Sequence, residues 1–225
     1  MADSTDDGVI VNGLQIAFLV AGSYLVGAIP MGVLVARLSG GTDPRTVGSG
    51  RTGGTNALRA LGRRRAAVVV VGDVLKGTLP VLVARWLTGG DAGADVLCAA
   101  AAVFGSSNSV FVGFGGGRGV GTGVGTMLVI QPLVVALVAP VFVLVILVTR
   151  YVSLGSLLGS AATLPAMLLI WAIASGAVPP AYIAWGAIGP ALVWLAHRDN
   201  IVRLVRGQER KFDVTLLGGR GGQAA

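Results

Sequence analysis

Seven apolar segments, separated by short polar stretches, dominate this chain of 225 residues and limit what it can fold into. A helix that crosses a bilayer needs about 20 apolar residues, and several of the segments are that long. Only 12% of the residues are charged, whereas soluble domains carry about 25%. We therefore expect an all-α polytopic membrane protein with about seven transmembrane helices. The segments are Val9–Leu38, Ala66–Leu87, Ala94–Phe114, Val120–Ile130, Leu133–Thr149, Leu154–Ile173 and Ala181–Ala196.

Two of these segments differ from a simple span. The first is longer than a bilayer requires, which predicts a tilt or a kink at Pro30. The fourth, Val120–Ile130, is short and rich in glycine, so we expect a half-helix that does not reach the far face. Six spans and one re-entrant segment are therefore an alternative to seven spans.

The distribution of arginine and lysine predicts the orientation of the helices. Seven arginines lie between Arg37 and Arg65, and six basic residues follow the last segment. The loops on the other side, Thr88–Gly93 and Ser175–Pro180, contain none. Because basic loops stay in the cytoplasm, we place the N-terminus outside and the C-terminus in the cytoplasm. The expected organisation is an acidic N-terminal tail (1–8), a single transmembrane domain (9–212) and a flexible C-terminal tail (213–225).

The net charge of +7 also bears on the partners of the protein. Membrane topology and attraction to anionic lipid headgroups account for it, because the sequence has no interleaved aromatic and basic residues of the kind found on nucleic-acid surfaces. We expect membrane lipids and no nucleic acid as partners. The basic face should attract anions, and phosphate-bearing substrates are anions.

The stretch Gly48–Gly53 fits the dinucleotide-binding pattern G-x-G-x-x-G. That pattern requires a buried strand immediately before it, and residues 40–47, with two glycines and a proline, cannot form one. Two interpretations remain. The loop either surrounds a phosphate with backbone N–H groups ahead of a helix N-terminus, or it is a flexible cytoplasmic loop. Its candidate phosphate-binding residues are Gly48, Ser49, Gly50, Gly53, Thr55, Asn56 and Arg59.

Charged residues inside or beside the apolar segments form two further candidate sites. An ionisable residue within a span costs roughly 2.5–3.5 kcal/mol, and Asp73 and Lys76 lie three residues apart in one. They either neutralise each other or line a substrate pocket. Arg118, within Gly115–Gly119, either binds a phosphate that approaches the glycine backbone or marks a tight turn between helices.

Few other residues suggest chemistry. His197 is the only histidine and Cys98 the only cysteine, so neither a Ser-His-Asp set nor a metal site can be argued. We expect no metal and no cofactor. Cys98 is expected to pack in an apolar run, and Gly155 and Gly159 to allow close helix packing.

Together these motifs resemble the bacterial acyl-phosphate-dependent glycerol-3-phosphate acyltransferases, a family of seven-span inner-membrane enzymes. The resemblance extends from Tyr24 to Phe212, with the motifs in the family's order. They are Tyr24–Pro30; Val47–Gly50 with Gly53, Thr55–Asn56 and Arg59–Gly62; Asp73 with Lys76–Gly77 and Pro80; Phe114 with Gly116–Val120; Arg150–Leu154; and His197–Arg198 with Asn200, Arg203 and Glu209.

The resemblance implies acyl transfer from an acyl phosphate to the 1-hydroxyl of glycerol 3-phosphate, which yields lysophosphatidic acid for phospholipid biosynthesis. It implies a multi-pass enzyme of the bacterial inner membrane, a single transmembrane acyltransferase domain without a cofactor, and we expect a monomer. The residues implied in catalysis are Ser49, Arg59, Arg118, Asn200 and His197. Those implied in binding the substrates and their phosphates are Gly48, Gly50, Gly53, Thr55, Asn56, Lys76, Gly116, Gly117, Gly119 and Arg203.

Several positions depart from the family's motifs. Arg51 stands where the family has Asn, and Arg118 where it has Lys. Ser106 and Ser109 take the places of the His and the Pro in a Gly-His-x-x-Pro element. Two alternatives therefore stay open: a diverged paralogue with altered or lost activity, and a small anion transporter, because broken helices and charges within the membrane also mark transport pathways.

Overall fold

The computed structural model describes residues 12–174 and 178–213, and within them the regular structure is helical apart from one isolated bridge between Ser109 and Gly115. The predicted N-terminal tail at 1–8, all but Asp213 of the predicted C-terminal tail at 213–225, and part of the loop 175–180 lie outside the described residues. The helices are α1 (Gly13–Ala28), α2 (Met31–Leu38), η1 (Pro44–Thr46), α3 (Gly54–Leu61), α4 (Arg63–Leu87), α5 (Ala92–Ser107), η2 (Val110–Val112), α6 (Val120–Ile130), α7 (Pro132–Thr149), α8 (Val152–Ala161), α9 (Thr163–Ile173), α10 (Pro180–Ala196) and α11 (Arg198–Val205).

The described part of the chain contains three helical stretches long and apolar enough to cross a membrane, namely α4, α7 and α8 with α9. The pair α1 and α2 is a fourth if it counts as one span, and it is bent by 50°. The break lies at Ile29 and Pro30, which confirms the predicted kink. Shorter apolar helices are α5, α6 and α10. At about 1.5 Å per residue, the 11 residues of α6 extend roughly 16 Å, about half of the hydrocarbon thickness.

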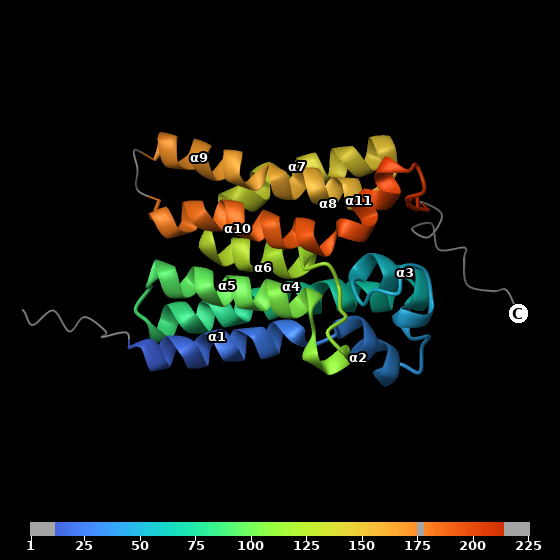
Figure 1. Ribbon diagram of the computed structural model, residues 1–225, viewed down its shortest axis with the longest axis horizontal. Helices are drawn as coiled ribbons and strands as arrows, with labels where there is room; N and C mark the ends of the chain where they lie inside the picture. The colour runs from blue at the N-terminus through green and yellow to red at the C-terminus, as the bar shows by residue number, and fades with distance from the viewer. Residues whose placement is uncertain (1–11, 175–177, 214–225) are drawn as a thin grey trace, which may run out of the picture.

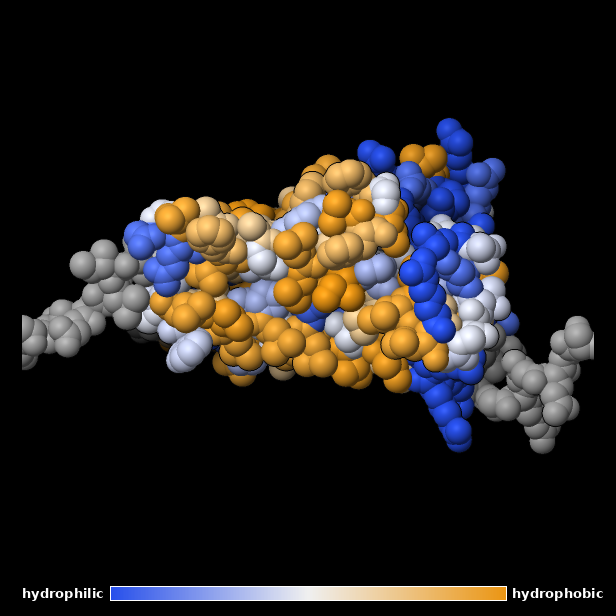
Figure 2. All heavy atoms as spheres, turned by 90° about the horizontal axis from the view of Figure 1, so that it is seen from below, coloured by the Kyte–Doolittle hydropathy of each residue, from blue (hydrophilic) through white to orange (hydrophobic). Residues whose placement is uncertain are grey.

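The long helices lie side by side along one axis, and α2, α3 and α11 gather at one end of the bundle (Figure 1). We call this end, together with the loop 113–119 that leads into α6, the basic end. In Figure 2, apolar side chains cover the middle of the visible face, and hydrophilic side chains gather most densely at the basic end. An apolar belt between two polar ends is the surface expected of a membrane protein.

Glycines let several of these helices approach closely. A Cβ at Gly77 of α4 would overlap the carbonyl oxygen of Thr122 in α6, and one at Gly27 of α1 would overlap the backbone of Ala102 in α5. Small residues at such interfaces allow backbone-to-backbone contact, which drives helix association in lipid. Gly155 in α8 likewise faces α7, as predicted.

The structure differs from the sequence-based expectation in three places. The third apolar segment does not stay helical to Phe114, because α5 ends at Ser107 and the chain turns through η2, with left-handed backbone at Gly113 and Phe114. The short helix α11 was not predicted, and α3 was expected only as a helix without stated bounds after the phosphate-binding loop. Each has eight residues, and helices this short are stabilised by tertiary packing rather than by local preference.

Candidate active site

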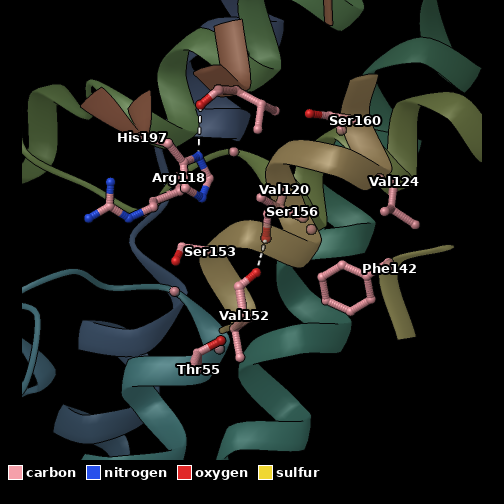
Figure 3. Close-up of a pocket in the computed structure, with 18 of the residues that line it drawn as sticks. Thr55, Arg118, Val120, Val124, Phe142, Val152, Ser153, Ser156, Ser160 and His197 are labelled. Carbon is pink, nitrogen blue, oxygen red and sulfur yellow. Dashed lines mark hydrogen bonds between the residues drawn. The ribbon is translucent and has the colours of Figure 1, made fainter. Parts of the chain in front are cut away.

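A cavity of about 460 Å³ lies at the basic end and continues between α6, α7, α8 and α10. Five arginines, His197 and Asn200 line its part at the basic end, and mainly aliphatic side chains line the part between the helices. Figure 3 shows this change, with Arg118, His197 and Ser153 on one side and Val124 and Phe142 on the other.

The loop before α3 is held in shape by one buried amide. Asn56 is only 3% exposed, and its Nδ2 donates to the carbonyl oxygens of Pro44 (2.6 Å), Val47 (3.1 Å) and Arg51 (2.8 Å). Its Oδ1 accepts from the backbone N–H of Ser49 at 3.0 Å. Because these bonds use both amide hydrogens, Asn56 shapes the loop and has no N–H left for a phosphate. The structure thus orders this loop, contrary to the flexible-loop alternative.

Other residues of the same loop face the cavity. Ser49, Gly53, Thr55 and Arg59 line it, whereas Gly48 and Gly50 do not. Among the described residues, Arg59 has no side-chain hydrogen bond or ion pair. Burial, together with the nearby charge of Arg210, lowers its pKa below the usual value. The charge of Glu209 acts on Arg59 in the opposite sense but forms no direct ion pair with it. A half-buried guanidinium without a direct ion-pair partner is a favourable site for a bound anion.

The loop that enters α6 places Arg118 opposite the end of α10. The N–H of Gly117 donates to Ser106 O at 2.9 Å, and Gly117 and Gly119 line the cavity while Gly116 does not. Arg118 Nη1 donates to Ala196 O at 2.5 Å. Burial, with the charges of Arg51 and Arg203, lowers the pKa of Arg118 to about 10, so it remains a cation near neutral pH.

His197 caps α10 and is 2% exposed. Its Nδ1 lies 2.8 Å from the carbonyl oxygen of Val193 (Figure 3). A carbonyl only accepts, so this contact assigns the proton to Nδ1 and leaves Nε2 as the acceptor nitrogen. Burial, helped by the neighbouring Arg118, lowers the pKa of His197 to about 4. The imidazole is therefore neutral at physiological pH.

Glu209 joins three residues around the cavity. Its Oε1 accepts from Ser153 Oγ at 3.0 Å and from Asn200 Nδ2 at 2.6 Å, and its Oε2 accepts from Arg203 Nε at 2.8 Å. The buried Oδ1 of Asn200 has no partner among the described residues. Since the carboxylate fixes which amide atom faces it, Oδ1 is an acceptor at the cavity wall.

The sequence analysis assigned no role to Glu209, Ser153, Arg51 or Arg210, although all four line the cavity. Glu209 carried two usable signals, because it stands in the last of the family's motifs and is the only acidic residue between Asp199 and Lys211 in a basic stretch. Arg51 also forms an ion pair with Asp199, with Nη2 and Oδ2 2.9 Å apart. This pair joins segments 148 residues apart.

The prediction that Lys76 binds a substrate phosphate does not agree with its position, because Lys76 does not line the cavity. Its Nζ lies 2.8 Å from Asp73 Oδ1 and donates to Ile29 O at 3.0 Å. The side chain is 5% exposed. Lys76 forms the internal ion pair, because its ammonium group binds a carboxylate of its own helix and a carbonyl exposed by the break between α1 and α2. Asp73, in contrast, also lines the cavity.

Serines replace the family's His and Pro without leaving unpaired groups. Thr122 Oγ1 donates to Ser106 Oγ at 3.0 Å, which connects α6 to α5. Ser109 Oγ donates to Ala28 O at 2.5 Å, which connects the following loop to α1. Within residues 12–174 and 178–213, no group of three or more His, Cys, Asp or Glu side chains is placed to hold a metal ion.

The fold defines a multi-pass membrane protein, and its cavity is cationic at one end and apolar at the other. The glycerol-3-phosphate acyltransferase family matches residues 17–207. The chain is 40% identical over 200 residues to the glycerol-3-phosphate acyltransferase of Anaeromyxobacter sp. (strain Fw109-5), covering 87% of this chain and 96% of the relative. It is 42% identical over 200 residues to that of Thermus thermophilus, covering 84% and 92%.

Solved structures agree with these relatives. PlsY (YgiH), an integral membrane glycerol 3-phosphate acyltransferase, in its glycerol 3-phosphate form is 34% identical, with a TM-score of 0.80 over 92% of this chain and 100% of PlsY. Its lysophosphatidic acid form gives a TM-score of 0.77 at 33% identity, over 91% of this chain and 99% of PlsY. The chain belongs to the glycerol-3-phosphate acyltransferase family.

Proposed function

We propose that this protein transfers an acyl group from an acyl phosphate to the 1-hydroxyl of glycerol 3-phosphate and forms lysophosphatidic acid. The observation that carries the proposal is the single cavity in which a cluster of arginines meets an apolar groove. One substrate is small and doubly charged, and the other joins a phosphate to a hydrocarbon chain. A site that is cationic at one end and apolar at the other accommodates both.

The phosphate groups bind at the basic end. Arg59 and Arg118 supply the charge, because both line the cavity, and Ser49 and Thr55 supply neutral donors. Charge-assisted hydrogen bonds from guanidinium groups are about twice as strong as neutral ones. Gly53, Gly117 and Gly119 let a phosphate lie close to the backbone.

Acyl transfer at this site needs no protein nucleophile. The 1-hydroxyl oxygen attacks the acyl carbon, the bond from that carbon to the phosphate oxygen breaks, and inorganic phosphate leaves. The hydroxyl proton passes to the departing phosphate, either directly or by way of His197 Nε2. Asn200 Oδ1 accepts a hydrogen bond from a glycerol hydroxyl, which accounts for its lack of a protein partner. Positioning and charge stabilisation supply the acceleration.

The test uses purified protein in vesicles with palmitoyl phosphate and glycerol 3-phosphate. We expect lysophosphatidic acid and inorganic phosphate in equal amounts, and none with palmitoyl-coenzyme A as donor. Arg59→Ala and Asn200→Ala should abolish turnover, whereas Arg64→Ala, which removes an exposed arginine outside the cavity, should not. An inactive wild-type protein beside an active preparation of the Thermus thermophilus relative would contradict the proposal.

We also propose that seven segments cross or enter the membrane as one domain, with the basic end in the cytoplasm. The gathering of α3, α11 and the cavity arginines at one end supports this orientation. The only native thiol, Cys98, is buried, so introduced cysteines can report the topology. Ala92→Cys should react with an impermeant maleimide added to intact cells, and Arg64→Cys only after lysis. The reverse pattern would contradict the orientation.

A further inference from the structure

The groove between the helices has a closed inner end. Its innermost lining residues are Met127 of α6, Val134 of α7, Thr163 of α9 and Trp185 of α10, and all four are buried. Met167, one turn beyond Thr163, is fully buried and does not line the cavity. A packed core therefore closes the groove, and we call these four residues the floor.

Trp185 is the largest residue of the floor, and its position is tightly defined. A Cβ at Gly189 would lie 3.2–3.5 Å from three atoms of the indole ring, so the ring lies against Gly189, which also lines the cavity. Trp185 is 1% exposed, and its Nε1 has no hydrogen-bond partner among the described residues. A buried donor without a partner is costly. A smaller apolar side chain would avoid this cost if the residue at this position only had to fill space. A rigid ring that closes the end of the groove explains the tryptophan better.

The distance from the floor to the basic end determines how long a hydrocarbon chain the groove can hold. Trp185 precedes His197 by 12 residues along α10, which is about 18 Å at a rise of about 1.5 Å per residue. An extended hydrocarbon advances roughly 1.25 Å per carbon because its C–C bonds are about 1.5 Å long. A straight chain of about 14 carbons therefore spans this distance at most. The indole ring shortens the space, because it lies against Gly189 and not at the level of its own backbone.

We propose that the floor, and Trp185 above all, limits the length of the acyl chain that the enzyme accepts. This inference rests on the proposed acyl transfer. A chain that is too long either leaves carbons outside the groove or holds its carbonyl away from the phosphate site. Because the chain enters the groove from lipid and not from water, the preference comes from exclusion of chains that are too long and not from burial of further carbons.

The test is a competition assay in vesicles with an equimolar mixture of saturated C12 to C20 acyl phosphates and glycerol 3-phosphate, with the lysophosphatidic acids separated by mass spectrometry. The ratios of products do not depend on how much protein is folded. Wild type should favour chains up to about C14. Trp185→Ala should shift the products toward C16 and longer chains, because loss of the indole ring lengthens the groove.

Two further variants complete the design. Trp194→Ala removes the same side chain from the same helix at a position that does not line the cavity, and should leave the ratios unchanged. Val138→Phe adds a ring one turn above Val134 on the lining face of α7, and should shift the products toward C12.

Lysophosphatidic acid with an unchanged distribution in Trp185→Ala would overturn the inference while leaving the proposed function in place. If Trp185→Ala yields no folded protein, an unchanged distribution in Val138→Phe would overturn it equally. Absence of lysophosphatidic acid from wild type with every chain would instead contradict the proposed function.

Discussion

His197 is held neutral by burial, and this makes the stability of the protein depend on pH below neutrality. Its pKa is about 4 in the folded protein against an ordinary value of 6.5, so between these values the unfolded state binds more protons. The free energy of unfolding should fall as pH drops from about 6.5 to 4, by up to about 3 kcal/mol. Thermal unfolding in detergent should show a smaller decrease for His197→Gln over this range. If thermal stability falls equally with pH in wild type and in His197→Gln, the lowered pKa of His197 is contradicted.

Arg51 is a cavity cation that Asp199 partly neutralises. Both side chains are partly exposed, at 27% and 46%, so the pair itself contributes less than about 1 kcal/mol. A substrate phosphate competes with Asp199 for the guanidinium. Asp199→Asn should therefore lower the KM for glycerol 3-phosphate about threefold, and Arg51→Asn should raise it by a similar factor.

The matched control for this prediction is Arg206→Gln, which removes an exposed arginine that follows the same short helix and does not line the cavity. Its KM should stay at the wild-type value in the same initial-rate assay. A KM in Asp199→Asn that is unchanged, or higher than in wild type, would show that Arg51 does not contact the phosphate.

Single residues also show what sequence alone could establish. Three of the five cavity arginines, His197 and Asn200 could be assigned to the site because they stand in motifs in the order of a known family; the three are Arg59, Arg118 and Arg203. The bonds of Asn56 and the pairing of Lys76 could not be predicted, because they depend on carbonyl groups at Pro44 and Ile29 that only the folded chain brings near. Glu209 gained a role only once α11 and α8 were placed together.

At the scale of elements, the loop before α3 depends on Asn56. Asn56→Ala leaves several buried backbone groups without partners, at a cost of about 1–3 kcal/mol for each. We expect it to disorder residues 44–51, to speed their cleavage by trypsin after Arg45, and to raise the KM for glycerol 3-phosphate by tenfold or more. Thr46→Ala removes an exposed hydroxyl that bonds Asp43 O, and should do neither. If trypsin cleaves Asn56→Ala no faster than wild type, Asn56 does not hold this loop in shape.

The apolar helices were more predictable than the helices at the basic end. Hydropathy alone gave the bounds of Val120–Ile130, because a membrane helix needs a continuous apolar run and the glycine and proline residues mark its ends. α3 and α11 are short and polar on one side, so no such signal exists for them. Their positions follow from packing against α4 and α10, which the sequence does not reveal.

At the scale of the whole molecule, a polar cluster joins four helices at the end opposite the cavity arginines. Arg85 donates to Asp95 Oδ2 (2.9 Å), Val129 O (2.9 Å) and Tyr182 OH (2.9 Å), and Tyr182 donates to Asp95 Oδ2 (2.7 Å). Asp95 is fully buried. The cluster connects α4, α5, α6 and α10.

Removing one partner of this cluster leaves a buried charge. Arg85→Met should therefore destabilise the protein by about 3–5 kcal/mol, whereas Arg85→Met combined with Asp95→Leu should recover most of that loss. Neither residue lines the cavity, so the KM values of the folded fractions should match wild type. Unfolding in detergent checks the energies. A double variant no more stable than Arg85→Met would contradict the explanation.

The proposed reaction requires that residues far apart in the sequence form one phosphate site. Membership of the acyltransferase family and the position of the arginines at one end favour an enzyme over the anion transporter. Equilibrium binding of radiolabelled glycerol 3-phosphate to the purified protein tests this claim directly. Arg59→Ala, Arg118→Ala and Asn200→Ala should each weaken binding at least tenfold, while Arg64→Ala should bind as wild type does. Equal affinities in all five proteins would contradict the account.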